Sequence, residues 1–255
     1  MWLNFKSFLI WSLVVGGLGM FCILLYQSME GEMKDMAEAF SNMGAFSDAF
    51  GMSTLSIATM SGYFATEVGT VHGLGSAMFA AILSIGIISK EEEGHSGEFL
   101  FSHPVSRKKI VAAKGLCVFI YLLLFTLLCT GLYELGFKMT GESVPLKGFL
   151  TFMGMQTVMN LEIGAVCFVI SSLPGKNRTG TGIAIAVLMY FFDVIGRVVP
   201  DLKEYLFIGP FSYANASEIL SGAELCTKGL IVAVMVMAVS LVGAFVIFDR
   251  RDLLS

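Results

Sequence analysis

Six long apolar segments recur along this chain, and each is long enough to cross a lipid bilayer as a helix. The hydrocarbon core of a bilayer requires about 20 apolar residues in helical conformation, within a range of about 17–25. A helix satisfies its backbone hydrogen bonds internally, so segments of this kind fold as helices in lipid. The sequence therefore predicts an all-α integral membrane protein with one transmembrane domain over residues 1–255. The six segments are Phe8–Tyr26, Gly69–Ser89, Gly115–Tyr133, Phe149–Leu173, Thr179–Val199 and Gly229–Phe248.

Composition excludes a soluble domain of this size. The 255 residues are 56% hydrophobic and 14% charged, with a mean hydropathy of +0.79, whereas soluble domains carry roughly 25% charged residues. The net charge of −4 and the lack of a basic block argue against a nucleic-acid partner. The five cysteines show no C-x-x-C spacing, so we expect neither a disulfide framework nor a zinc site.

The distribution of basic residues predicts that both termini are cytoplasmic. With the N-terminus inside, ten of the 16 Lys and Arg residues fall on the cytoplasmic side and six on the outer side, as the positive-inside rule requires. No A-x-A-like cleavage site follows the first apolar segment, so we expect a retained helix. We recognise no eukaryotic sorting signal, which favours the inner or plasma membrane of a bacterium.

The stretches between the apolar segments have distinct characters. Met29–Phe40 places Met and Phe at helical spacing among acidic residues, which predicts an amphipathic helix at the outer interface. Gly51–Ala65 is apolar but short, and we expect a second outer helix or a re-entrant one. The predicted non-spanning regions are an interfacial entry segment (1–7), two outer loops (27–66 and 200–227) and a cytoplasmic loop (90–114).

The cytoplasmic loop 90–114 carries the most informative pattern in the chain. The second apolar segment ends in charge at Glu91–Glu93, and Gly94 then allows the chain to turn. Glu98–Phe101 is a short amphipathic piece that Pro104 ends, and Ser106 can cap the helix that follows. A short apolar helix held between two membrane helices on the cytoplasmic side is suited to fit the groove of a partner protein.

This loop resembles the one after the second transmembrane helix in permease subunits of ABC-2-type ABC transporters. The closing run Phe248–Leu253 is similar to the basic R-D-L tail of that family, and Phe5–Trp11 is similar to its amphipathic entry. The resemblance covers the whole chain, since length, helix number and topology also agree. The loop residues that match are Glu92, Glu93, Gly94, Ser96, Glu98, Leu100, Ser102, Pro104, Val105, Ser106, Arg107, Ile110 and Lys114.

The resemblance implies an ABC-2 permease fold, like that of type V exporters, whose loop docks on a separate cytoplasmic ATPase. Two identical or similar permeases would then face each other above two ATPase subunits, which bind ATP and Mg. The chain itself contains no G-x-x-x-x-G-K-[ST] phosphate loop, so we expect it to hold no cofactor and to be no enzyme alone. The residues implied in ATPase coupling are Glu92, Glu93, Gly94, Ser96, Glu98, Phe99, Leu100, Pro104 and Arg107.

The loop also contains Gly94-His-Ser-Gly97, which matches the G-x-S-G of rhomboid intramembrane proteases. That chemistry needs the serine at a helix start inside the membrane, with a histidine from another helix as base. Here the serine lies among charges in a cytoplasmic loop. We therefore expect no catalytic residues and no metal site.

Ionisable residues inside two of the apolar segments are candidate functional groups, because each costs about 2.5–3.5 kcal/mol to insert. Glu162 lies near the middle of the fourth segment, with Asn160 two residues earlier. They either line a translocation path or form an interhelical hydrogen bond, and both interpretations stay open. Asp193 and Arg197 are four residues apart and share a helix face, which predicts a structural ion pair near the outer end.

These features together predict the membrane-spanning subunit of an ATP-driven exporter. The apolar interior favours an amphiphilic substrate such as a peptide, an antibiotic or a lipid. Glycines in the first, second and fifth segments permit close helix packing. Together with the resemblance, they lead us to expect those helices at the subunit interface and the translocation path. Two alternatives stay open, a secondary transporter and a non-transporting membrane sensor or assembly partner.

Overall fold

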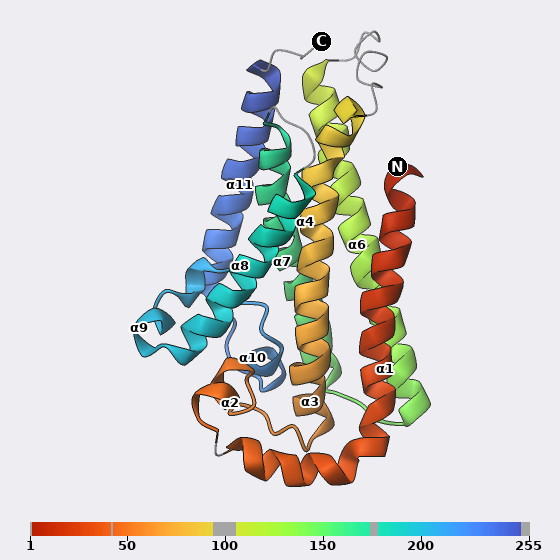
Figure 1. Ribbon diagram of the computed structural model, residues 1–255, viewed down its shortest axis with the longest axis vertical. Helices are drawn as coiled ribbons and strands as arrows, with labels where there is room; N and C mark the ends of the chain where they lie inside the picture. The colour runs from red at the N-terminus through yellow and green to blue at the C-terminus, as the bar shows by residue number, and fades with distance from the viewer. Residues whose placement is uncertain (1, 42, 94–105, 174–177, 251–255) are drawn as a thin grey trace.

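The computed structural model describes residues 2–41, 43–93, 106–173 and 178–250, and throughout these ranges the regular structure is helical. Six of the described helices are long and apolar enough to cross a membrane, which confirms the predicted all-α class (Figure 1). Each lies close to a predicted segment. They are α1 (Trp2–Ser41), α4 (Gly69–Glu93), α6 (Arg107–Thr140), α7 (Leu146–Ser171), α8 (Thr179–Val198) and α11 (Thr227–Arg250).

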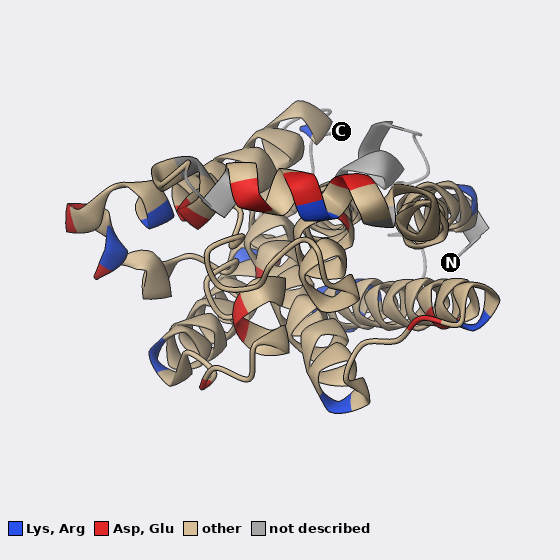
Figure 2. Ribbon diagram, turned by 90° about the horizontal axis from the view of Figure 1, so that it is seen from below, with Lys and Arg blue, Asp and Glu red and all other residues tan. Residues whose placement is uncertain are grey.

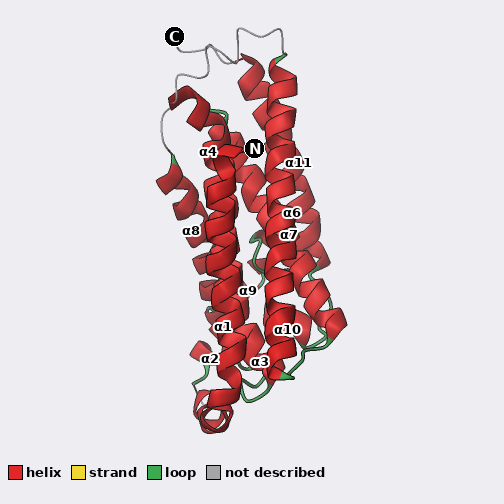
Figure 3. Cartoon of the chain, turned by 90° about the vertical axis from the view of Figure 1, so that its right-hand side faces the viewer, coloured by secondary structure: helices red, strands yellow, loops and turns green. Residues whose placement is uncertain are grey.

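The six long helices form two layers of three (Figure 3). One layer holds α8, α4 and α1, and the other holds α11, α7 and α6. Helices α4 and α7 occupy the middle of their layers and pack against each other. Small residues of α4 make this approach possible, since Gly73 lies against Gln156, and Ser84 lies against Gly164 of α7. The central pair is therefore the best shielded part of the molecule.

The first residues of α1 and the last residues of α11 lie at the same end of the bundle (Figure 1). This is the cytoplasmic end in the predicted topology. The apolar part of α1 covers Asn4–Met29. The rest of the helix, to Ser41, turns across the opposite, outer end, with Met33 buried and Lys34 and Asp35 exposed. Its charged residues appear as alternating bands in Figure 2. The amphipathic stretch is thus continuous with the first span.

The second span begins earlier than its predicted start. Thr59 caps α3 (Met60–Tyr63) by accepting a hydrogen bond from the backbone N–H of Gly62. A π-helical turn, Phe64–Val68, then continues directly into α4. The stretch Gly51–Ala65 therefore forms neither a separate outer helix nor a re-entrant one. After α2 (Ala45–Ala49) it makes turns, and its last residues are the first turns of the span.

The outer segment between α8 and α11 is partly buried inside the bundle. It contains α9 (Pro200–Lys203), the 3-10 turn η2 (Leu206–Ile208) and α10 (Ala216–Leu220). Between η2 and α10 the chain turns into the bundle, where Phe211, Tyr213 and Ala214 are buried. We call residues 209–215 the inward segment.

Candidate functional site

The described members of the predicted ATPase-coupling set lie where α4 ends and α6 begins. Glu92 and Glu93 are in the last turn of α4, and Arg107 is the first residue of α6. The other predicted coupling residues lie outside the described residues. They are Gly94, Ser96, Glu98, Phe99, Leu100 and Pro104.

Both flanks of this junction are tied to neighbouring spans. The Lys114 Nζ of α6, which is buried, donates a hydrogen bond of 2.6 Å to the backbone oxygen of Ile87 in α4. Arg107 donates from Nη1 to the backbone oxygen of Asp249 in α11, at 3.2 Å. Lys108 lies 3.9 Å from the carboxylate of the same aspartate. These contacts join α4, α6 and α11 at the cytoplasmic end.

Glu162 is buried in α7 and accepts a hydrogen bond of 2.6 Å from the hydroxyl of Tyr213. Tyr213 comes from the inward segment, so this bond joins the outer chain to the interior of the bundle. Gly229 of α11 leaves space for the phenol ring, since a Cβ there would lie 3.1 Å from it. Burial and the neighbouring carboxyl group raise the pKa of Tyr213, which keeps the hydroxyl protonated as a donor.

Asn160 does not share a face with Glu162. Two residues along an α-helix correspond to about 200° of rotation, which points the two side chains in opposite directions. Asn160 is instead one turn from Gln156, and both are buried. Gln156 donates from Nε2 to the backbone oxygen of Ala214 at 2.8 Å. The side-chain oxygens of Asn160 and Gln156 have no hydrogen-bond partner among the described residues.

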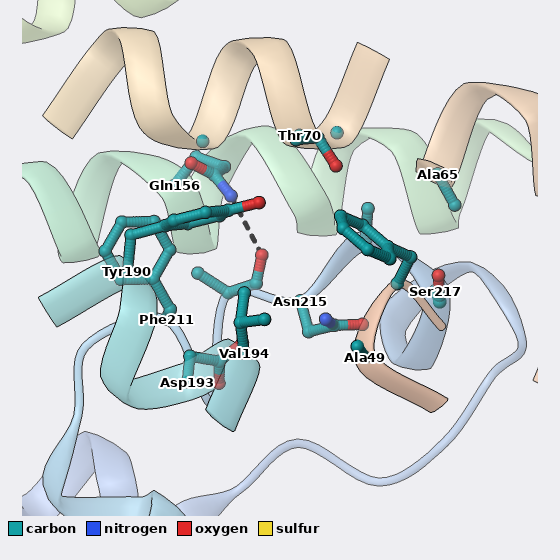
Figure 4. A pocket seen from close by; sticks show the side chains of 15 residues that line it. Ala49, Ala65, Thr70, Gln156, Tyr190, Asp193, Val194, Phe211, Asn215 and Ser217 are labelled. Carbon is teal, nitrogen blue, oxygen red and sulfur yellow. Dashed lines mark hydrogen bonds between the residues drawn. The ribbon is translucent and has the colours of Figure 1, made fainter. Parts of the chain in front are cut away.

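A small polar cavity lies beside Gln156 at the outer half of the bundle (Figure 4). It has a volume of about 50 Å³, which is room for a few water molecules. Its walls come from α2, α4, α7, α8 and the chain from the inward segment into α10. The polar side chains that line it are Thr70, Gln156, Tyr190, Asp193, Asn215 and Ser217.

The predicted ion pair of α8 is present and is part of a larger group. Arg197 Nε lies 2.8 Å from Asp193 Oδ2, and Arg197 Nη2 donates to Asp193 Oδ1 at 3.2 Å. Arg197 Nη1 also lies 2.6 Å from Glu218 Oε1 of α10, a partner that no local sequence pattern indicates. One arginine therefore joins the outer end of α8 to the segment before α11.

A buried histidine in the core was not predicted as a site residue. His72 of α4 lies with Nδ1 2.9 Å from the hydroxyl of Tyr133 in α6, and its ring packs against Phe125 and Phe152. The apolar sequence on either side of His72 was a signal of burial. Among the described residues, no group of three or more His, Cys, Asp or Glu could hold a metal ion. The polar groups are suited to holding helices together and to hydrogen bonding within the bundle.

Comparison of the sequence with models of known protein families identifies its family. The family model described as ABC-2 family transporter protein matches residues 6–253, nearly the whole chain. No curated protein matches the sequence in a direct comparison. The matched region includes all six long helices and the coupling loop, in agreement with the resemblance seen in the sequence. The chain belongs to the ABC-2 family of transporter proteins, as a multi-pass membrane permease subunit of an ABC transporter.

Proposed function

We propose that the chain is the permease subunit of an ATP-driven exporter that moves an amphiphilic substrate, such as a peptide, an antibiotic or a lipid. The observation that carries the proposal is the buried hydrogen bond from Lys114 to the Ile87 backbone. This bond links the start of α6 to the end of α4, at the two flanks of the predicted coupling loop. An ATPase docked on that loop would move both spans at once.

The partner that supplies energy is a separate cytoplasmic ABC ATPase, present in two copies that bind ATP and Mg. It would dock on the loop between Glu92 and Arg107. A second permease, identical or similar, would pack against the layer of α1, α4 and α8. The common layer of these three helices supports this assignment, since they can present a single face to a partner (Figure 3). The location would be a bacterial inner or plasma membrane.

The route for the substrate would follow the α4–α7 contact. Asn160 and Gln156 supply buried oxygens that have no partner among the described residues, on the α7 side of this contact. Glu162 would act deep in the bundle, where its bond to Tyr213 holds the inward segment in place. Apolar walls with a few fixed polar groups are typical of sites for amphiphilic ligands.

The test is affinity purification of the chain in mild detergent, with mass spectrometry of the co-purifying proteins and an ATPase assay. A variant with Glu98→Ala and Phe99→Ala is compared with a control that carries Lys203→Gln on exposed α9. We expect an ATP-binding subunit to accompany the wild type and the control. We expect the loop variant to lose that subunit or to uncouple its hydrolysis from substrate. A wild-type chain that purifies alone without ATPase activity would contradict the proposal and favour a secondary carrier or a sensor.

A further inference from the structure

An apolar groove of about 450 Å³ opens between α6, α7 and α11, in the layer away from α1 and α4. Its volume lies within the range of about 300–1,000 Å³ that is usual for sites of small ligands. Its lining is apolar, and it includes Gly115 and Phe119 of α6, Ala165 and Phe168 of α7, and Leu241 and Phe245 of α11.

Small residues create the hollow. A Cβ added to Gly115 would have Phe168 as its nearest neighbour, at an ordinary contact distance of 3.8 Å, so a side chain could be added here without a clash. Ala112 and Ala165 line the same hollow. Larger side chains at these positions would fill the space between the helices, as close packing normally does.

The groove has the depth of one membrane leaflet. On α6 its wall runs from Val111 to Phe119, which at 1.5 Å per residue is roughly 6 to 18 Å from the helix start at Arg107. On α11, Leu241 and Phe245 lie roughly 14 and 8 Å before the helix end. Half of the hydrocarbon core of a bilayer is about 15 Å. The groove thus lies near the cytoplasmic ends of α6 and α11, at a depth that an acyl chain of the cytoplasmic leaflet can reach.

Basic residues surround the cytoplasmic mouth of the groove. Lys108 precedes Ala112, Gly115 and Phe119 at helical spacing, so it lies at the head of the stripe that lines the groove. Its side chain is 71% exposed, and its Nζ lies 3.9 Å from the carboxylate of Asp249. Lys109 and Arg250 are also exposed at this end, so basic side chains outnumber acidic ones among those that the structure describes on α6 and α11 at the mouth.

We propose that this groove binds one acyl chain of an anionic phospholipid from the cytoplasmic leaflet, with the lipid phosphate held at Lys108. Any hollow that faces the membrane is filled by lipid chains. The basic mouth adds selectivity for an anionic headgroup, because each basic residue near the surface attracts such lipids. The lining of the groove does not include Gln156, Asn160 or Glu162 of the proposed substrate route, and the inference is independent of transport.

The experiment is native mass spectrometry of the full-length chain, with any subunits that accompany it, titrated with phosphatidylglycerol or phosphatidylcholine of the same acyl chains. We expect one phosphatidylglycerol to bind in preference to phosphatidylcholine. Lys108→Gln lowers phosphatidylglycerol affinity about fivefold, the effect of one basic residue near the surface, and leaves phosphatidylcholine binding unchanged. Gly115→Leu lowers the affinity for both lipids by roughly tenfold, the loss from displacing about two buried methylene groups.

Matched controls lie on the same helix. Gly131 is an exposed glycine of α6, and a Cβ added there would have no heavy atom within 4 Å, while Lys138 is an exposed lysine at the outer end. Gly131→Leu and Lys138→Gln should leave both affinities within about twofold, as surface substitutions usually do. Equal binding of the two lipids by the wild type overturns the proposal, as does equal weakening by Gly115→Leu and Gly131→Leu. A change of oligomeric state in Gly115→Leu alone also overturns it, because protein would then cover the groove.

Discussion

The two ends of the bundle each carry an ion pair, and the two pairs differ in almost every physical respect. At the outer end, Arg197 and Asp193 lie 2.8 Å apart, with side chains that are 10% and 9% exposed. At the cytoplasmic end, Lys108 and Asp249 lie 3.9 Å apart, with side chains that are 71% and 48% exposed. Buried pairs are costly to break, because one charge is left without compensation, whereas exposed pairs contribute little. The outer end is therefore fixed by its charges, and the cytoplasmic end is not.

Other polar contacts join distant parts of the chain at both depths of the bundle. In the interior, Tyr213 of the inward segment bonds to Glu162, and Gln156 bonds to the backbone oxygen of Ala214. At the cytoplasmic end, Lys114 and Arg107 bond to backbone oxygens of neighbouring helices. A long side chain that bonds to a backbone oxygen tolerates small helix shifts better than a bidentate pair does. Under the proposed function, the end that receives force from the ATPase is the end whose contacts allow movement.

The largest effect should come from breaking the outer pair. Arg197→Gln leaves the buried Asp193 carboxylate and Glu218 without their cation, and we expect a loss of about 3–5 kcal/mol in the free energy of unfolding. Thermal unfolding in detergent measures the loss, with Lys203→Gln on exposed α9 as the control. The double variant Asp193→Asn/Arg197→Gln should recover part of the stability, because it leaves no buried charge. Equal stability of Arg197→Gln and the control would show that the pair does not hold the outer end.

The next effect concerns the inward segment. Tyr213→Phe removes the donor to Glu162 and leaves a buried carboxyl group without its hydrogen bond, which costs about 1–3 kcal/mol. The control is Tyr205→Phe, because Tyr205 is exposed. Thermal unfolding checks the expected order, in which Tyr213→Phe falls between Arg197→Gln and the control.

Glu162→Gln separates a structural role from a transport role at the same position. The amide oxygen still accepts the hydrogen bond from Tyr213, so we expect stability to change by less than about 1 kcal/mol. Under the proposed function, removal of the charge lowers the rate of export by the assembled complex. Export at the wild-type rate from a normally folded variant would place Glu162 outside the route.

Local signals in the sequence predicted the parts of this molecule that depend on local interactions. Apolar segments of about 20 residues predicted the six spans, and the four-residue spacing of Asp193 and Arg197 predicted their pair. Tyr213 and Glu162 are 51 residues apart, so no local pattern could join them. The apolar Phe211 and Tyr213 inside an outer loop were nevertheless a signal that this segment is buried.

Other differences between the predicted and the observed structure have physical causes that hydropathy does not reveal. Helix α6 runs from Arg107 to Thr140, well beyond the predicted Gly115–Tyr133, because a helix continues outside the lipid as long as its residues allow it. It ends at Gly141, whose φ of +71° places it in the left-handed region that glycine adopts without strain. Asn160 and Glu162 were considered together because they are close in sequence, but a helix places them on opposite faces.

A moderate effect on coupling is expected from removing the hydrogen bond between Lys114 and Ile87 at the cytoplasmic end. Lys114→Met removes the hydrogen bond to Ile87, which lowers stability. It also removes a buried charge, which raises stability, so the two effects partly cancel. We expect the free energy of unfolding to change by less than about 1.5 kcal/mol. Under the proposed function, the assembled complex should lose substrate stimulation of ATP hydrolysis, which an ATPase assay measures. Lys138→Met, at the exposed outer end of α6, is the control that should keep stimulation.

The smallest effect should come from the exposed cytoplasmic pair. Asp249→Asn removes the partner of Lys108, and we expect less than about 0.5 kcal/mol of change in stability, because both side chains are solvated and the pair is long. Added salt should reduce this small stability difference further, since ions screen the attraction between exposed charges. Asp201→Asn on exposed α9 is the control. A loss from Asp249→Asn as large as that from Arg197→Gln would remove the contrast between the two ends, and the outer end could no longer be regarded as the fixed one.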